Sequence, residues 1–274
     1  MFVAPLGSGS AGNAYLFESE QTRILVDAGF GPKETKRRME EVGRSFETLT
    51  ALVITHEHYD HIRGAESIAR KLSIPVYLTC GTLKASRLDP SVVKTVTFPN
   101  NTSFRIGDLQ IHARRTIHDA ADPACFVVES GDGTRVGVAS DLGYADQPVV
   151  QHLMHCDGLL FESNHDLDML RSGTYPWSLK RRIMSRYGHL SNDDSMLAVR
   201  SMIGHEMKNL CLIHLSARNN HESIVRTLAA GVIATTGSHL ELNIVPQNRP
   251  MGMLEISRKG PRRNVLPPAQ LRLF

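Results

Sequence analysis

The sequence predicts an α/β protein in which short strands come first and a strand–helix alternation follows. Residues 2–6 and 14–17 read as short strands around a glycine- and serine-rich turn. After Asp141, apolar strand-like runs alternate with amphipathic helical stretches. Neither an internal repeat nor a long Pro/Gly/Ser-rich linker divides the chain. We therefore expect one domain over residues 1–256 and a C-terminal tail over residues 257–274.

The individual elements follow from local patterns along the chain. Apolar and β-branched runs predict strands at residues 2–6, 14–17, 22–26, 51–55, 158–162 and 210–214, with further short strands between turns over residues 76–138. Amphipathic periodicity predicts helices at residues 33–42, 62–72, 82–87, 179–187, 193–203 and 222–230. Pro32 supports the start of the first helix, because proline fits a first helical turn.

Composition bounds the function without naming a partner. The chain of 274 residues has 31 Lys and Arg against 28 Asp and Glu, and its net charge of +3 is too small to demonstrate a polyanionic ligand. No apolar run approaches a membrane span, and the first residues lack the basic and apolar regions of a leader. The four cysteines are widely spaced, without a CxxC pair. We expect a cytoplasmic protein with reduced cysteines and no membrane partner.

Residues 7–12 match the dinucleotide fingerprint GxGxxG letter for letter. That fingerprint requires a helix directly after it, because the helix N-terminus binds the pyrophosphate. Residues 14–17 instead look like a strand, so we reject a dinucleotide site. Two interpretations remain: a glycine-rich β-turn, or a loop whose amides help to hold an anion beside an active site.

The strongest functional signal is the hexapeptide His-Glu-His-Tyr-Asp-His at residues 56–61, which follows a predicted buried strand. His56 and His58 share a face in extended backbone, and the turn into the next helix brings Asp60 and His61 toward a neighbouring point. Two adjacent metal ions would fit that geometry. The motif is not the HExxH of zinc proteases, which needs a histidine at position 60.

Three further residues, His118, Asp141 and His214, follow or end apolar strand-like runs. Loops at strand ends commonly build functional sites. Taken singly, a histidine at a strand end is more often a hydrogen-bonding residue, but the order and spacing of the set favour metal ligands. Neutral imidazoles and carboxylates suit Zn²⁺, Mn²⁺ or Fe²⁺.

In this order the residues resemble the metallo-β-lactamase fold superfamily, whose motifs run Asp, HxHxDH, His, Asp and His. The resemblance spans roughly residues 5–256 and implies a four-layer αββα sandwich with a dinuclear metal site at one edge. It implies one metal ion on His56, His58 and His118, a second on Asp60, His61 and His214, and Asp141 as the bridge. Asp27 would orient the His-rich loop without binding metal.

The phrases around these motifs resemble the YycJ/WalJ-type subgroup, which implies a 5′-to-3′ DNA exonuclease or a related phosphodiesterase. They are GSGSAGN at 7–13, ESNHD at 162–166, YPWSLKRRI at 175–183, GHLSN at 188–192 and HLSARNN at 214–220. The stretch between Asp141 and His214 leaves no room for the inserted domain of the β-CASP relatives. The implied partner is a nucleic acid, DNA in the first place.

This function implies phosphodiester hydrolysis by a hydroxide that bridges two metal ions. Asp60 would orient the hydroxide or accept its proton. His189, in the phrase GHLSN, would contact the scissile phosphate or protonate the leaving oxygen. The alternative for His189 is a structural histidine at a helix N-terminus, beside the capping region at residues 191–192.

Substrate contacts are expected from polar loops and from one basic, aromatic segment. Ser8, Ser10, Asn13, Asn219 and Asn220 are expected at the rim of the site, although such residues often only cap or face solvent. Trp177, Arg181 and Arg182, with Lys180, Arg186 and Tyr187 nearby, would suit a phosphate backbone and an unpaired base. The alternative for this segment is a solvated helix face.

Two other functions compete with the nuclease. The first is a metal-dependent hydrolase of a small ester, thioester, lactone or cyclic phosphodiester, which the same ligands would serve. The second is a binding module without catalysis, which is disfavoured because all seven ligand positions hold ligand-type side chains.

Overall fold

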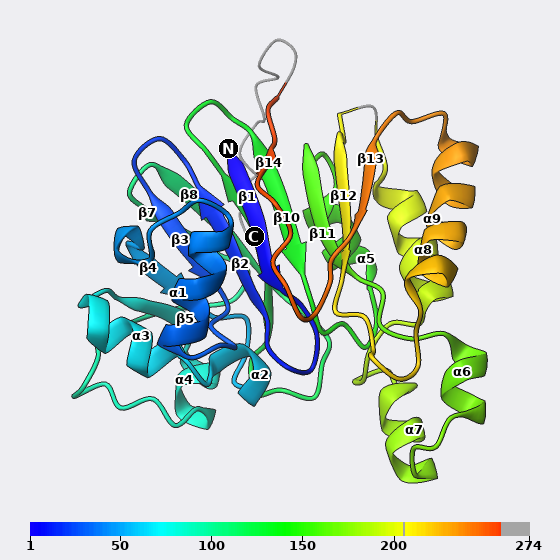
Figure 1. Ribbon diagram of the computed structural model, residues 1–274, viewed down its shortest axis with the longest axis horizontal. Coiled ribbons are helices and arrows are strands. Elements are labelled where there is room, and N and C mark those ends of the chain that lie inside the picture. The colour runs from blue at the N-terminus through cyan, green and yellow to red at the C-terminus, as the bar shows by residue number, and fades with distance from the viewer. Residues whose placement is uncertain (205, 259–274) are drawn as a thin grey trace, which may run out of the picture.

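The computed structural model describes residues 1–204 and 206–258, which form two seven-stranded sheets packed face to face (Figure 1). The first sheet has the strand order β14 (Leu254–Glu255), β1 (Phe2–Gly7), β2 (Ala14–Glu18), β3 (Arg23–Val26), β4 (Ala51–Val53), β5 (Val76–Thr79) and β6 (Thr95–Phe98). The second has the order β13 (Glu241–Ile244), β12 (Asn209–Ile213), β11 (Gly158–Glu162), β10 (Arg135–Ala139), β9 (Ala124–Glu129), β8 (Leu109–Arg115) and β7 (Ser103–Ile106).

Helices cover the outer face of each sheet and complete the four layers. The first sheet is covered by α1 (Pro32–Glu41), the 3-10 turn η1 (Phe46–Thr48), α3 (Ala65–Leu72) and α4 (Cys80–Ala85). The second is covered by α5 (Gln147–Leu153), α8 (Asn192–Met202) and α9 (Glu222–Thr236). The short helices α2 (Tyr59–Ile62), α6 (Leu167–Ser172) and α7 (Trp177–Ile183) lie toward one end of the sandwich (Figure 1). The predicted αββα sandwich is therefore confirmed.

Alternation along each strand separates three apolar layers. In β2, Tyr15 and Phe17 point into the layer between the sheets, whereas Leu16 packs under the helices of the first sheet. In β9, Phe126 joins the central layer and Val127 packs under the helices of the second sheet. Both faces of these strands are buried, so their sequences read as continuous apolar runs.

Strand direction determines where loops can form a site. In the first sheet β3 and β4 are parallel, and in the second β10, β11 and β12 are parallel. Strand β8 runs in the same direction as β10, because both are antiparallel to β9. The carboxyl ends of the strands within each set therefore meet at one edge of their sheet, and the His-rich loop after β4 lies at such an edge.

The glycine-rich segment at residues 7–12 is a turn between two strands, as the rejection of a dinucleotide site requires. The helix expected over residues 62–72 begins at Ala65 instead, as α3, and residues 63 and 64 separate it from the short helix α2. The Gly64 amide donates to Ala28 O at 2.8 Å, and a Cβ on Gly64 would stand 1.9 Å from Phe30 O. The Gly64–Ala28 hydrogen bond ends α2 and holds the residues between α2 and α3 against the end of β3.

Sequence patterns did not predict the short helices α5 and α6 or the edge strands β13 and β14. Among the described residues, no helix combines the length and the apolar character that crossing a membrane requires. The division into one domain over residues 1–256 and a tail remains a prediction, and residues 259–274 of that tail lie outside the described residues.

Gly29 joins the end of β3 to the His-rich loop at very short range. Its amide donates to Asn13 O at 2.8 Å, and the Asn13 amide donates to Asp60 O at 2.8 Å. A Cβ on Gly29 would lie 1.9 Å from Asp60 O and 2.4 Å from Asn13 N. Because both contacts are with backbone, no side-chain rotation can relieve them.

We therefore predict that Gly29→Ala lowers the free energy of unfolding by about 1–3 kcal/mol, the usual cost of forcing atoms into a filled space. Urea unfolding of the two proteins measures this difference. Gly231→Ala is the control, because Gly231 lies inside α9 with open space around its Cβ position. That change should raise stability by about 0.5–1 kcal/mol. Equal stability of Gly29→Ala and wild type would contradict the packing described above.

Candidate metal centre

Nine acidic and imidazole side chains come from the ends of six strands. They are Asp27 after β3, His56, His58, Asp60 and His61 after β4, His118 after β8, Asp141 after β10, Glu162 at the end of β11, and His214 after β12. Residues so far apart in the sequence converge because all six strands end in the loops that build this site.

Three of these residues adopt left-handed backbone conformations at the point where a strand ends. The φ angles of Asp27, Asp141 and His214 are 60°, 55° and 57°. Positive φ is uncommon outside glycine, although aspartate and histidine tolerate it better than most residues. Such a conformation turns the chain within a single residue, and it recurs here at the end of β3, β10 and β12.

Two groups of side chains within this cluster can each hold a metal ion. The first consists of His56, His58, His118 and Asp141, and the second of Asp60, His61, Asp141 and His214. Within each group the ligand-type atoms lie within 4.8 Å of one another. Asp141 belongs to both groups, so the two candidate positions are adjacent. Asp141, Glu162, His189 and His214 form a third group that meets the same criterion.

The donor atoms of the cluster fit divalent cations. His56 Nε2, His214 Nε2 and Asp141 Oδ1 are buried, and none has a hydrogen-bond partner among the described residues. A buried polar atom without a partner is costly, so native proteins normally satisfy it. Imidazole nitrogens and carboxylate oxygens are the ligands of Zn²⁺ and related ions.

The charge balance of the cluster points the same way. Among the described residues, the ion pairs of Asp27, Asp60, Asp141 and Glu162 are all with histidines, never with lysine or arginine. Burial alone would raise the pKa of Asp141, but the imidazoles of His214 and His61 hold it well below its usual range. Burial holds the pKa of His56 well below its usual range. The cluster thus requires positive charge from outside its own side chains or from protonated imidazoles.

A layer of hydrogen bonds fixes the His-rich loop from behind. Asp27 Oδ2 lies 2.7 Å from His61 Nδ1, and Asp27 Oδ1 accepts from the amide of Thr55 at 2.9 Å. Asn13 Nδ2 lies 2.9 Å from His61 Nε2 and donates to Asp60 Oδ2 at 3.2 Å. Asp27 thus occupies the orienting position that the resemblance implied.

The structure places two residues expected at the rim beneath it. Ser8 and Asn13 are fully buried. Ser8 Oγ accepts from the backbone amide of His214 at 2.8 Å and bonds Tyr15 Oη at 2.8 Å. These side chains lie below the rim because they satisfy polar groups of the cluster, whereas Ser10 is exposed.

Asn219 and Asn220 are also buried, in contrast to the rim position expected for them. Asn220 Nδ2 donates to the carbonyl oxygens of Ser163 and Asn164 at 3.0 and 2.9 Å. The backbone carbonyl oxygen of Asn219 accepts from the backbone amide of Asp166 at 2.8 Å. Both residues therefore tie the loop after β12 to the loop after β11.

Glu162 is the acidic residue of the cluster that sequence patterns missed. It is completely buried, and its Oε1 lies 2.8 Å from His189 Nδ1 and 3.0 Å from His214 Nδ1. Its Oε2 accepts from the amides of Leu142 and Leu190. The signal in the sequence was a charged residue closing the apolar run 158–162, the same signal that identified Asp141 after its strand.

The basic segment divides into buried and exposed members. Lys180 is buried, and its Nζ donates to the carbonyl oxygens of Arg171 and Gly173 at 2.7 and 2.6 Å. Trp177 is 61% exposed, and Arg181 is also exposed. Lys180 therefore stabilises the turn before α7, while its neighbours face solvent.

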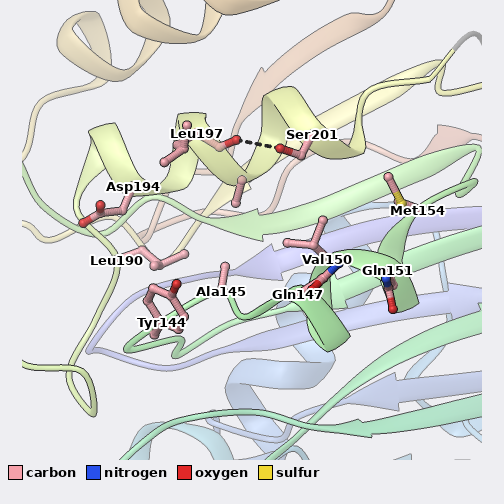
Figure 2. Close-up of a pocket in the computed structure, with 11 residues that line it drawn as sticks. Tyr144, Ala145, Gln147, Val150, Gln151, Met154, Leu190, Asp194, Leu197 and Ser201 are labelled. Carbon is pink, nitrogen blue, oxygen red and sulfur yellow. Dashed lines mark hydrogen bonds between the residues drawn. The ribbon is translucent and has the colours of Figure 1, made fainter.

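A cleft beside the cluster brings together residues that are far apart in the sequence. Ser10, Asp119, Arg182 and His189 line it. Trp177 and Arg181 are not among its lining residues. A second hollow, shown in Figure 2, lies between α5 and α8 and is lined by apolar residues such as Tyr144 and Leu197. None of its lining residues belongs to the candidate metal groups.

Comparisons with known proteins agree with this geometry. The family model described as a beta-lactamase superfamily domain matches residues 22–215. The exodeoxyribonuclease YycJ of Bacillus anthracis is 32% identical over 238 residues, which cover 85% of this chain and 89% of that protein. The exodeoxyribonuclease WalJ of Streptococcus pneumoniae is 36% identical over 236 residues, covering 82% and 87%.

Solved structures show the same fold. The metallo-beta-lactamase fold protein YhfI from Bacillus subtilis has a TM-score of 0.69 to this chain at 20% identity, covering 91% of this chain and 98% of the other. At that level of identity the likeness concerns the arrangement of the elements alone.

We predict that Glu162→Ala lowers the free energy of unfolding by about 3 kcal/mol or more, because several buried donors lose their acceptor at about 1–3 kcal/mol each. Denaturant unfolding measures the change. The matched control is Glu206→Ala, which removes an exposed pair with His155 and should change stability by no more than about 0.5 kcal/mol. A loss below about 1 kcal/mol for Glu162→Ala would mean that the buried network contributes little.

Proposed function

The chain belongs to the metallo-β-lactamase superfamily, and from that premise we propose that it is a divalent-metal-dependent DNA exonuclease that acts from the 5′ end. The observation that carries the proposal is the pair of adjacent ligand groups sharing Asp141 at the edge of the sandwich. The names of the YycJ and WalJ relatives support a DNA substrate. We also propose a cytoplasmic location, as predicted from the sequence.

We assign the two ligand groups to two divalent ions, Zn²⁺, Mn²⁺ or Fe²⁺. One ion would be held by His56, His58 and His118, the other by Asp60, His61 and His214, with Asp141 shared between them. His56 Nε2 and His214 Nε2, which are buried without a hydrogen-bond partner among the described residues, support this assignment. Such ions, when bound, lower the pKa of a water molecule and neutralise charge on phosphate oxygens.

His189 is the proposed proton donor to the leaving oxygen. Its Nδ1 lies 2.8 Å from the buried carboxylate of Glu162, which fixes the ring and leaves Nε2 as its second functional nitrogen. The carboxylate also raises the pKa of His189 against the opposing effect of burial. Its side chain is 22% exposed and lines the cleft, so substrate can reach the ring.

Asp60 is the proposed acceptor of the proton of the attacking water. Its side chain is 23% exposed, unlike the buried side chain of Asp141. Asn13 holds Asp60 through its side-chain amide at 3.2 Å, which keeps one carboxylate oxygen oriented. Proton acceptance by a carboxylate oriented in this way is ordinary general-base chemistry.

The exposed residues near the cleft are proposed to bind the DNA strand. Arg182 and Ser10 line the cleft, and the exposed Trp177 and Arg181 extend beyond it along α7. Arginines pair with phosphates, and an exposed tryptophan can stack on an unpaired base. The other four residues predicted to contact substrate, Ser8, Asn13, Asn219 and Asn220, are buried, and they instead hold the loops of the site in place from beneath.

The proposal predicts that the purified protein with Mn²⁺ or Zn²⁺ degrades single-stranded DNA labelled at its 5′ end by early release of labelled mononucleotide. The same DNA labelled at its 3′ end should lose its label last. Chelation should abolish both reactions, and added metal should restore them. Hydrolysis of a small ester with no cleavage of DNA under any divalent metal would overturn the proposal.

His189→Ala should lower turnover of DNA by roughly 10²–10⁴-fold, the usual contribution of a general acid or base. Metal content, measured by elemental analysis, should stay near two ions per chain, because His189 lies outside the two assigned ligand groups. The control variant is His152→Ala. The His152 ring lies away from the cluster and bonds the backbone carbonyl oxygen of His112 at 3.0 Å. Loss of one ion from His189→Ala would reassign this histidine as a ligand.

A further inference from the structure

Arg182, in the last turn of α7, makes one ion pair with a residue from a distant segment. Its Nε donates to Asp119 Oδ2 at 2.6 Å, although the Arg182 side chain is 60% exposed. Within the part of the chain that the structure describes, this is the single hydrogen bond of the guanidinium. A guanidinium carries five donors in one plane, so its two terminal nitrogens keep their capacity to bind an anion.

Asp119 is itself fixed from two other directions. Its backbone amide donates to Tyr187 O at 3.0 Å, just beyond the end of α7. Its second carboxylate oxygen, Oδ1, lies 3.2 Å from His118 Nε2 and 3.9 Å from His58 Nε2. The carboxylate therefore stands between the first ligand group and Arg182, and it connects them.

We propose that Asp119 is a positioning residue, whose carboxylate holds the Arg182 guanidinium at the cleft so that its terminal nitrogens receive a substrate phosphate. This inference rests on the proposed phosphodiesterase function. Arg182, Asp119 and His189 line the same cleft, so a phosphate beside His189 lies within the space that Arg182 borders. An arginine that is already oriented loses less side-chain freedom when it binds phosphate in its planar, two-bond geometry.

The fold of α7 does not depend on this pair. Lys180 Nζ anchors the helix to two carbonyl oxygens, and the His189 amide donates to Ile183 O at 2.9 Å just after it. Exposed ion pairs contribute little to stability. The effect of the Asp119–Arg182 pair therefore falls on the orientation of one side chain.

Arg171, in the last turn of the neighbouring helix α6, provides the matched comparison. It has the same charge and is exposed, but within the described residues it makes no ion pair, and it does not line the cleft. Removing its charge therefore tests the general electrostatic attraction of the segment. Removing the charge of Arg182 tests attraction together with position.

The test uses Mn²⁺-loaded protein and the small anionic diester bis(p-nitrophenyl) phosphate. Asp119→Asn and Arg182→Gln should each raise KM by about 10-fold, the value of one charge-assisted hydrogen bond, with kcat changed less than about 3-fold. The double variant should show no further rise, because both changes remove the same contact. Arg171→Gln should leave KM unchanged. Asp119→Glu should restore part of the loss, and KM for the neutral ester p-nitrophenyl acetate should not move in any variant.

Additive effects of the two substitutions, or a normal KM in Asp119→Asn, would overturn the proposal. Loss of manganese from Asp119→Asn would overturn it as well, since Asp119 would then be a metal ligand. If wild type hydrolyses no phosphodiester, the proposed function fails, and calorimetric titration with inorganic phosphate still decides the role of Asp119. In that titration Kd should rise in Asp119→Asn and Arg182→Gln but not in Arg171→Gln, and equal values in all three would refute the positioning role of Asp119.

Discussion

The organisation of this molecule depends on placing four carboxylates, three of them buried, beside five imidazoles at one edge of a sandwich. A buried charge without compensation is among the costliest features that a fold can contain. In the part of the chain that the structure describes, the carboxylates of Asp27, Asp60, Asp141 and Glu162 pair with imidazoles and not with the side chains of lysine or arginine. Every loop around the site is held by hydrogen bonds that keep these opposite charges together.

The parallel strands make this concentration of charge geometrically possible. Residues at the carboxyl ends of β10, β11 and β12 are neighbours although they are far apart in the chain. Asp141, Glu162 and His214 thus meet without any long loop. The glycine-rich turn after β1 closes the cluster from the first sheet, since Ser8 accepts a hydrogen bond from the amide of His214.

Sequence patterns predicted the parts of the fold and site that rest on local rules. Apolar runs located the strands before Asp141 and His214, and the hexapeptide at 56–61 located the His-rich loop. Contacts between distant segments were not predictable in this way. The Gly64 amide bonds Ala28 O and not the turn before it, and Phe30 O leaves no space there for a Cβ, but no residue near position 64 signals these contacts.

The same distinction explains which site residues were misplaced or missed. Ser8 and Asn13 look like exposed turn residues in the sequence, yet they are buried by partners near residues 60 and 214. In the sequence Lys180 looks like part of a basic surface. In the structure it is buried, and its ammonium group donates to two backbone carbonyl oxygens. Burial depends on the whole fold, whereas residue type and spacing are visible locally.

The left-handed conformations of Asp27, Asp141 and His214 carry a consequence for how the protein is maintained. Conformations of this kind cost about 1–3 kcal/mol each in a non-glycine residue. Glycine at these positions would remove that cost, but it would also remove the side chains that build the site. On the proposed function, ions that bind only the folded state would stabilise it by mass action and offset this strain. At an ion concentration one hundred times the dissociation constant, the stabilisation is about 2.7 kcal/mol. The lifetime of the folded protein would then follow the supply of its metal, so scarcity would remove the molecule as well as its activity.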